Sequence, residues 1–206
     1  MMIKNVVFDF GGVFVDLDGE RSKEAFRALG VNDIDAYLDP YLQRGLFRDL
    51  ENGSVGAGDF VRALGGMAGR ELSYESVRDA WLAFIVGVDQ EKLRFAASLR
   101  DNRRVFLLSN TNPFVMDWAD TPAFSPDGLP LSAYFDKTYR SCDIGLTKPD
   151  PRIFEFMLED GGMVPEETLF VDDGPANVAA ARDMGLRAYL AVNGEDWRAD
   201  VSALLR

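Results

Sequence analysis

Four short apolar runs along the chain are each followed directly by polar residues or glycine. The runs are Ile3–Phe8, Val105–Leu108, Thr168–Val171 and Leu186–Val192. Such runs, rich in Val, Ile, Leu or Phe, are typical of strands buried inside a sheet. We therefore expect the polar side chains that follow to lie at the carboxyl ends of these strands.

Amphipathic helical patterns lie between the runs, at residues 91–99, 151–158 and 177–184. The second pattern begins with proline and the third stops before Gly185, as helices commonly do. Alternating strands and helices predict an α/β fold, with a Rossmann-like, doubly wound parallel sheet covered by helices on both faces. In such sheets ligands bind at the carboxyl ends of the strands, where the polar residues of this chain fall.

The alternation is interrupted over residues 16–88, which show helical patterns and no convincing strand. The patterns lie at 22–29, 34–42, 60–67 and 74–85. An insertion directly after the first strand would lie above the strand ends. We expect a core domain of residues 1–15 and 89–206 and an all-helical cap domain of residues 16–88. Residues 118–130 are predicted to form a long loop, either functional or mobile.

The absence of histidine narrows the chemistry that the chain can perform. With Cys142 as the only cysteine, neither a Ser-His-Asp nor a Cys-His arrangement can be built, and no zinc site of His and Cys ligands. Carboxylates, hydroxyls, amides and lysine remain, and Mg²⁺ is the metal ion that oxygen ligands favour. The single cysteine also excludes an intrachain disulfide, which fits a reducing cytosol.

Charge and hydropathy limit the expected partners. A formal charge of −12 opposes nucleic-acid binding, and no basic patch offsets it. No stretch is long enough to span a membrane, and the first apolar run is too short for a signal peptide. We expect a cytoplasmic monomer or homodimer with no nucleic-acid or membrane partner. A small anionic substrate stays compatible with this charge, because a metal ion and one lysine create a local positive spot.

Four polar clusters carry residue types suited to phosphoryl transfer. They are Asp9 in VVFDFGG, Ser109-Asn110 in LLSNTN, Lys148 in GLTKPD and Asp172-Asp173 in FVDDGPAN. Singly, each has an ordinary structural explanation, as a strand end, a turn, a solvated lysine or a helix N-cap. Together at one sheet edge, they supply a carboxylate nucleophile, magnesium ligands and a positive charge for phosphate.

In order and context these clusters resemble the haloacid dehalogenase-like hydrolases, over nearly the whole chain. Within that superfamily they resemble the helical-capped group that includes bacterial glucose-1-phosphate phosphatases and the N-terminal phosphatase domain of soluble epoxide hydrolases. The resemblance implies a Mg²⁺-dependent phosphatase that hydrolyses a small phosphorylated metabolite, a sugar phosphate being favoured. It also implies an aspartyl-phosphate intermediate.

The resemblance assigns roles to individual residues. Asp9 would be the nucleophile, and Lys148 would neutralise charge on Asp9 and on the phosphate. The residues that it gives to substrate binding are Ser109, Asn110 and Lys148. The residues that it gives to the metal ion are Asp9, the carbonyl of Gly11 and Asp173. Asp172 and Asn177 would not bind the ion themselves but would hold its ligands in position.

Gly11 departs from the family pattern, in which a second Asp follows the nucleophile by two residues. In the family that Asp protonates the leaving group and later activates water, and such help is worth about 10²–10⁴-fold in rate. Three explanations stay open: a leaving group that needs little protonation, another carboxylate such as Asp16 or Asp18, or a slow protein that mainly binds phosphate. The glycine of the glucose-1-phosphate phosphatase group favours the first, as with an anomeric sugar phosphate or an acyl phosphate.

Residues 16–19 (DLDG) imitate the family's usual Asp-x-Asp-Gly motif, but the apolar run before them is short, so Asp9 is preferred as nucleophile. A 2-haloacid dehalogenase is one alternative function, against which the Asp172-Asp173 pair argues. A phospho-acceptor domain like a response regulator is another, although its residues follow a different order. A catalytically weak phosphate-binding or regulatory protein is the third. The candidate substrate contacts in the cap are Phe47, Arg48 and Trp81.

Overall fold

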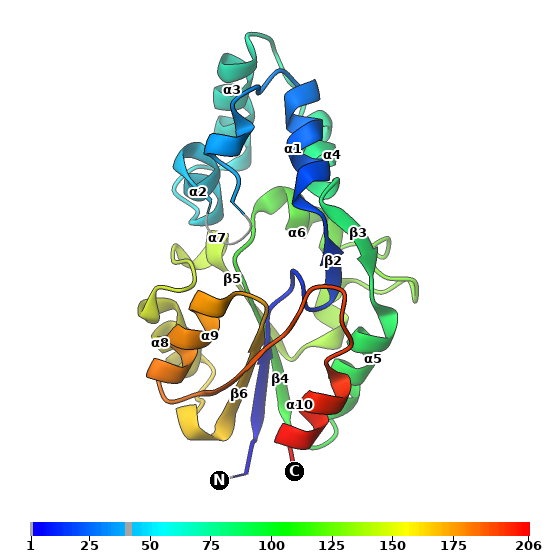
Figure 1. Cartoon of the computed structure of the whole chain (residues 1–206), viewed down its shortest axis with the longest axis vertical. Helices are drawn as coiled ribbons and strands as arrows, with labels where there is room; N and C mark the ends of the chain where they lie inside the picture. The colour runs from blue at the N-terminus through cyan, green and yellow to red at the C-terminus, as the bar shows by residue number, and fades with distance from the viewer. Residues whose placement is uncertain (1, 40–42) are drawn as a thin grey trace.

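A five-stranded parallel sheet forms the core of the computed structural model, which describes residues 2–39 and 43–206 (Figure 1). The strands are β1 (Asn5–Phe8), β4 (Arg104–Ser109), β5 (Lys137–Arg140), β6 (Thr168–Asp172) and β7 (Arg187–Leu190). Their order is β5-β4-β1-β6-β7, so the chain builds one half of the sheet and then crosses β1 to build the other. This confirms the predicted parallel α/β fold and places the reversal of strand order at the end of β1.

Alternating side chains of β1 face two separate apolar layers, because successive residues of a strand point to opposite faces. Val6 and Phe8 belong to the larger layer, and Val7 belongs to the smaller one. The helices over the larger layer are α5 (Gln90–Leu99) and α10 (Arg198–Leu204), and those over the smaller one are α8 (Pro151–Asp160) and α9 (Pro175–Asp183). Figure 1 shows these pairs on opposite sides of the sheet, as a doubly wound fold requires.

Trp197 ties the C-terminal segment to the centre of the core. Its ring centroid lies 5.2 Å from that of Phe8, 5.7 Å from that of Phe14 and 5.8 Å from that of Phe95. Its indole nitrogen donates a hydrogen bond to the carbonyl of Val13 at 3.0 Å. The side chain therefore packs against β1 and holds the turn that follows the strand.

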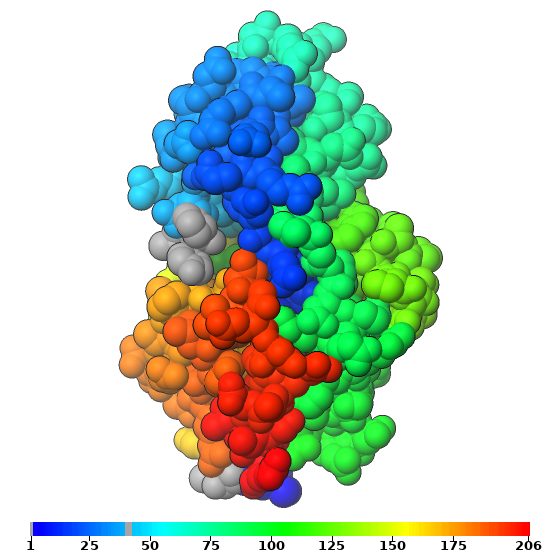
Figure 2. All heavy atoms as spheres, turned by 45° about the vertical axis from the view of Figure 1, so that its right-hand side comes forward, coloured from blue at the N-terminus to red at the C-terminus, as the bar shows by residue number. Residues whose placement is uncertain are grey.

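The helices of the inserted segment stand above the carboxyl ends of the strands (Figure 1). They are α1 (Gly19–Ala28), α2 (Gly45–Glu51), α3 (Ala57–Ala68) and α4 (Tyr74–Leu82). Edge-to-face contacts of Phe26 and Phe60 with Phe47 fill the space between them. In Figure 2 this segment, in blue and teal, is stacked on one end of the core. Across residues 2–39 and 43–206, no helix is long and apolar enough to cross a membrane.

Two strands, β2 (Val15–Leu17) and β3 (Ile85–Val88), pair antiparallel and join the inserted segment to the core. The expectation of no strand within residues 16–88 was therefore wrong at the edges of that range. Such short strands exist only through pairing between distant parts of the chain, which a local pattern does not reveal. Strand β2 crosses the first boundary expected for the cap and β3 ends at the second, and the division into 1–15 with 89–206 and 16–88 stays a prediction.

Several helical boundaries also differ from the sequence pattern. The helix expected over 74–85 ends at Leu82, and the one expected over 34–42 is a 3₁₀ turn at Ile34–Ala36, with residues 40–42 outside the description. The sequence did not predict β5, α2, α10, α6 (Pro113–Ala119) or α7 (Ser141–Ile144). Most of these elements are short, and too few residues repeat in them to establish a period.

Helix α6 is the support on which the cap rests. The ring of Phe114 lies 4.8 Å from that of Tyr74 and 5.8 Å from that of Phe60, both of which come from cap helices. The hydroxyl of Tyr74 also donates a hydrogen bond to the carboxylate of Asp117. These contacts bring α4 down onto the core beside the strand ends.

The long segment 118–130 is packed against the core. Trp118 lies in the last turn of α6. The buried ring of Phe124 lies 5.3 Å from the ring of Trp118 and 5.9 Å from that of Phe10. The hydroxyl of Ser125 accepts a hydrogen bond from that of Tyr134 at 2.9 Å. The loop thereby supports Phe10, the neighbour of Asp9.

We expect Trp197→Ala to lower the free energy of unfolding by about 3–5 kcal/mol, because it leaves a cavity against β1. Trp118→Ala is the matched control. Because Trp118 is half-buried, its loss should lower the free energy of unfolding by roughly 1–2 kcal/mol. Urea unfolding followed by circular dichroism measures both values. Equal losses in the two variants would contradict this account of Trp197.

Candidate active site

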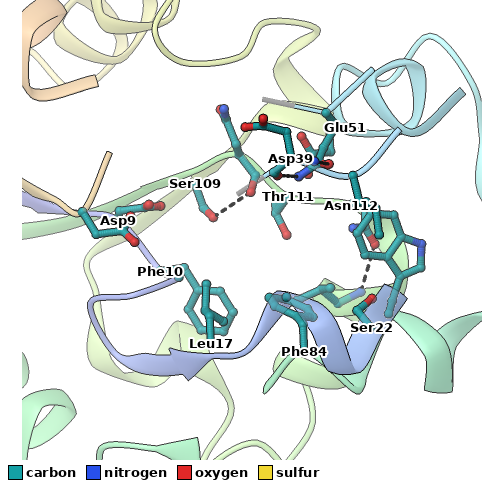
Figure 3. Close-up of a pocket in the computed structure, with 18 of the residues that line it drawn as sticks. Asp9, Phe10, Leu17, Ser22, Asp39, Glu51, Phe84, Ser109, Thr111 and Asn112 are labelled. Atoms are coloured by element: carbon teal, nitrogen blue, oxygen red, sulfur yellow. Dashed lines mark hydrogen bonds between the residues drawn. The ribbon is translucent and has the colours of Figure 1, made fainter. Parts of the chain in front are cut away.

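Three of the predicted polar clusters follow core strands directly. Asp9 comes after β1, and its backbone amide donates to the carbonyl of Val171 at 2.8 Å, which extends the pairing with β6. Ser109 is the last residue of β4 and Asp172 is the last residue of β6. Because neighbouring parallel strands end at one edge, residues far apart in sequence meet around a cavity of about 620 Å³ (Figure 3).

Lys148 is the centre of this cluster. Its side chain is fully buried, and its ammonium lies 2.9 Å from Oδ1 of Asp9 and 2.6 Å from Oδ2 of Asp172. It also donates a hydrogen bond to the carbonyl of Leu108 at 2.9 Å. An ammonium has three protons, and three oxygens lie within 2.9 Å of this one.

Asn110 positions the lysine. Its amide nitrogen donates to the carbonyl of Lys148 at 2.9 Å, and its side-chain oxygen accepts from the amide of Lys148 at 2.8 Å. Both ends of the side chain are thereby engaged with one peptide. The substrate-binding role expected for Asn110 stays a prediction, and the geometry adds a structural role.

Asp172 is held from both sides. Its Oδ1 accepts hydrogen bonds from the amide of Gly174 at 2.7 Å and from the side chain of Asn177 at 2.9 Å, while Oδ2 faces Lys148. These contacts fit the supporting roles predicted for Asp172 and Asn177.

Asp173 lies next to the left-handed turn at Gly12. A Cβ on Gly12 would come within 2.1 Å of Oδ2 of Asp173, and the φ of Gly12 is +65°. Only glycine leaves room for this carboxylate at that turn. The turn after β1 is therefore shaped around Asp173.

The cluster carries an excess of negative charge. Burial raises the pKa of Asp9 to about 7; Lys148 opposes this shift, and Asp172 and Asp173 add to it. Burial and the charge of Asp172 raise the pKa of Asp173 to about 6. Burial by itself would lower the pKa of Lys148, but Asp172 and Asp9 raise it above its usual value.

This charge and donor set fit a divalent cation. Asp9, Asp172 and Asp173 each offer a carboxylate oxygen, and these oxygens lie within 4.8 Å of one another. Three carboxylates and one ammonium leave two negative charges, which a hard dication would neutralise. The ligands are all oxygen, as Mg²⁺ prefers.

The other end of the cavity is formed by the cap. Residues there include Ser22, Lys23, Leu38, Asp39, Gln43, Glu51, Trp81 and Phe84. Of the cap contacts predicted from the sequence, Trp81 lines the cavity. Phe47 is buried among aromatic rings, and Arg48 points to its neighbour Asp49, so neither lines it.

Glu51 is the site residue that the sequence reading missed. It shares the buried face of α2 with Phe47 and Leu50. Residues 45–51 are too few to establish a helical period, so no local pattern indicated that this carboxyl group would be buried. Burial and the charge of Asp9 raise the pKa of Glu51 to about 8.

The carboxylates of the DLDG segment lie apart from the core cluster. Asp16 does not line the cavity, and Asp18 lines it as the exposed N-cap of α1, where Oδ1 accepts from the amide of Glu20 at 3.1 Å. Asp9, in contrast, lies beside Lys148. The geometry therefore supports the preference for Asp9 over Asp16.

Comparisons with known proteins agree with this arrangement. The sequence profile of the haloacid dehalogenase-like hydrolase family matches residues 3–185. A D-ribitol-5-phosphate phosphatase of Bacteroides thetaiotaomicron is 48% identical over 204 residues, which cover 99% of each chain.

Solved structures show the same fold. A HAD-like family hydrolase from Porphyromonas gingivalis has a TM-score of 0.96 at 48% identity, covering 100% of this chain and 99% of that one. A HAD family enzyme from Bacteroides thetaiotaomicron, solved with magnesium and inorganic phosphate, has a TM-score of 0.88 at 35% identity, covering 99% and 100%. These matches confirm the resemblance drawn from the sequence clusters.

We expect Gly12→Ala to weaken Mg²⁺ binding by about 10–100-fold, because the added methyl displaces the carboxylate of Asp173. Isothermal titration with Mg²⁺ in the presence of inorganic phosphate measures the affinity. Gly66→Ala is the control, since a Cβ there meets no atom within 4 Å. An unchanged affinity in Gly12→Ala would show that Asp173 does not hold the ion.

Proposed function

Because the chain belongs to the haloacid dehalogenase-like hydrolase family, we propose that it is a Mg²⁺-dependent phosphatase of small phosphorylated polyols or sugars. The observation that carries the proposal is the contact of Asp9 with the fully buried Lys148 at the floor of a capped cavity. A carboxylate beside an ammonium and a dication stays ionised, and it can attack phosphorus.

The core half of the cavity would perform the phosphoryl transfer. Asp9, Asp173 and the carbonyl of Gly11 would hold Mg²⁺, which neutralises charge on the phosphate when it is bound. The carboxylate of Asp9 would attack phosphorus to form an aspartyl phosphate. Lys148 would offset the charge that develops on the transferred group, and Ser109 would bind a phosphate oxygen.

The cap half of the cavity fits the hydroxyl groups of a polyol. Trp81 lines this half, where its ring would pack against the carbon chain of the substrate. Lys23 and Gln43 add polar groups on the same side. The substrate named for the 48% identical relative, D-ribitol 5-phosphate, carries hydroxyls of this kind.

Other functions are less compatible with the geometry. A 2-haloacid dehalogenase uses no metal ion, so an anionic substrate would meet the carboxylates of Asp9, Asp172 and Asp173 with only the charge of Lys148 to offset them. We propose that the protein acts as the monomer or homodimer expected from the sequence. We propose the cytoplasm, where phosphorylated metabolites occur, as the place of action.

Purified protein is expected to release phosphate from D-ribitol 5-phosphate in Mg²⁺, and to release none in EDTA. Asp9→Asn should lower the rate on the order of 10⁴-fold or more, because the nucleophile is lost. Inorganic phosphate is measured with a colorimetric assay across polyol phosphates, sugar phosphates, acyl phosphates and p-nitrophenyl phosphate.

Asp16→Asn is the matched control, since Asp16 lies outside the cavity, and its rate should stay within about threefold of the wild type. Release that persists in EDTA or in Asp9→Asn would refute the proposed mechanism. Binding of phosphate without release from any substrate would indicate a binding or regulatory protein.

A further inference from the structure

The core provides no side chain to protonate the leaving group of a polyol phosphate. An alkoxide is a poor leaving group, and its departure needs a proton donor. Gly11 stands two residues after Asp9 and has no side chain. A Cβ at Gly11 would lie 2.9 Å from Cδ1 of Leu17, so Leu17 fills the space that a side chain there would need.

Several carboxyl groups line the cavity apart from Asp9 and Asp173: Asp18, Glu20, Asp39 and Glu51. Asp18 caps α1, and Glu20 is exposed and pairs with Lys23 at 2.9 Å. Asp39 is half-buried. Glu51 is the most buried of these groups, with 9% of its surface exposed.

Glu51 is also unengaged within residues 2–39 and 43–206. Its carboxyl group makes no hydrogen bond and no ion pair with any of them, and the charges that act on it are those of Asp9 and Lys148. Burial, and after it the charge of Asp9, raise the pKa of this carboxyl to about 8, so it keeps its proton at neutral pH. A buried, protonated and unengaged carboxyl group facing a substrate cavity is suited to proton transfer.

The position of Glu51 fits the leaving-group side of the reaction. An in-line displacement places the leaving oxygen on the side of phosphorus opposite the nucleophile. Asp9 lies on the core side of the cavity, and Glu51 comes from the end of cap helix α2. Figure 3 shows the two carboxyl groups on opposite sides of the view, with Ser109 between them.

We propose that Glu51 is the acid–base residue of this enzyme and performs the proton transfers that Gly11 cannot. The proposal rests on the phosphatase function proposed above. It assigns to a cap residue the work that the family pattern gives to a second aspartate in the core.

The proton transfers balance in two steps. In the first, a carboxylate oxygen of Asp9 bonds to phosphorus, the ester P–O bond breaks, and Glu51 gives its proton to the departing alcohol. In the second, the Glu51 carboxylate takes a proton from water as the water oxygen bonds to phosphorus. The bond between Asp9 and phosphorus then breaks, which releases phosphate and restores protonated Glu51.

Glu51→Gln tests this role, because glutamine matches the size and neutrality of the protonated glutamate but cannot give up a proton. We expect kcat on D-ribitol 5-phosphate to fall about 10²–10⁴-fold. With p-nitrophenyl phosphate, whose leaving group needs no proton, the variant should release one nitrophenolate per enzyme in a rapid burst. Slow turnover should follow, with aspartyl phosphate accumulating on Asp9.

Asp49→Asn is the matched control, since Asp49 lies on the same helix as Glu51 but does not line the cavity, and it should keep the wild-type rate and show no burst. A Glu51→Gln variant with a raised KM, an unchanged kcat and no burst would show that Glu51 only binds a substrate hydroxyl, which overturns the proposal. A burst in Asp49→Asn but not in Glu51→Gln would overturn it as well. A wild type that releases no phosphate in Mg²⁺ would refute the phosphatase function, and this inference with it.

Discussion

The ammonium of Lys148 is the interaction on which the site depends. It is fully buried, and it lies within 2.9 Å of both Asp9 and Asp172, which end neighbouring strands of the sheet. Two carboxylates brought together away from water would repel each other, and a buried ammonium without partners would be very costly. Each group is therefore tolerable only because the others are present. With Asp173 included, the net charge of the cluster is negative, and for this reason a dication suits the site.

The topology of the sheet explains why these residues meet. Strand β1 lies in the centre, and the chain continues to β4 on one side and later to β6 on the other. The cap helices are inserted between β1 and β4, so the cap begins and ends near the place where β1 ends. Contacts of α4 with α6 then close the cavity from above. One part of the cavity is thus made by strand ends and the other by helices, which suits a substrate with a phosphate and a variable remainder.

The pairing of Gly11 with Glu51 would connect catalysis to the placement of the cap. If the proton donor is on α2 and the nucleophile is on β1, the reacting groups are assembled only when the cap rests on the core. With the cap open, Asp9 and Lys148 would have no proton donor near them. Hydrolysis would then be limited to the closed enzyme. A donor placed two residues after the nucleophile would impose no such condition.

The sequence by itself predicted four of the five strands of the sheet and the order of the polar clusters, and it singled out Asp9, Lys148 and the Asp172-Asp173 pair as candidate site residues. The strands and the clusters that end them follow from short-range patterns, because a buried strand and the polar residue that ends it are adjacent in the chain, whereas Lys148 was singled out by the family resemblance. The polar strand β5, the ribbon of β2 with β3 and the anchoring of Phe124 depended on tertiary structure, since each exists only through contacts with distant residues. The same holds for Asn110, whose side chain binds the backbone of Lys148. The place of Glu51 was decided by the fold alone, because only the packing of α2 turns an ordinary acidic residue into a buried carboxyl group that lines the cavity.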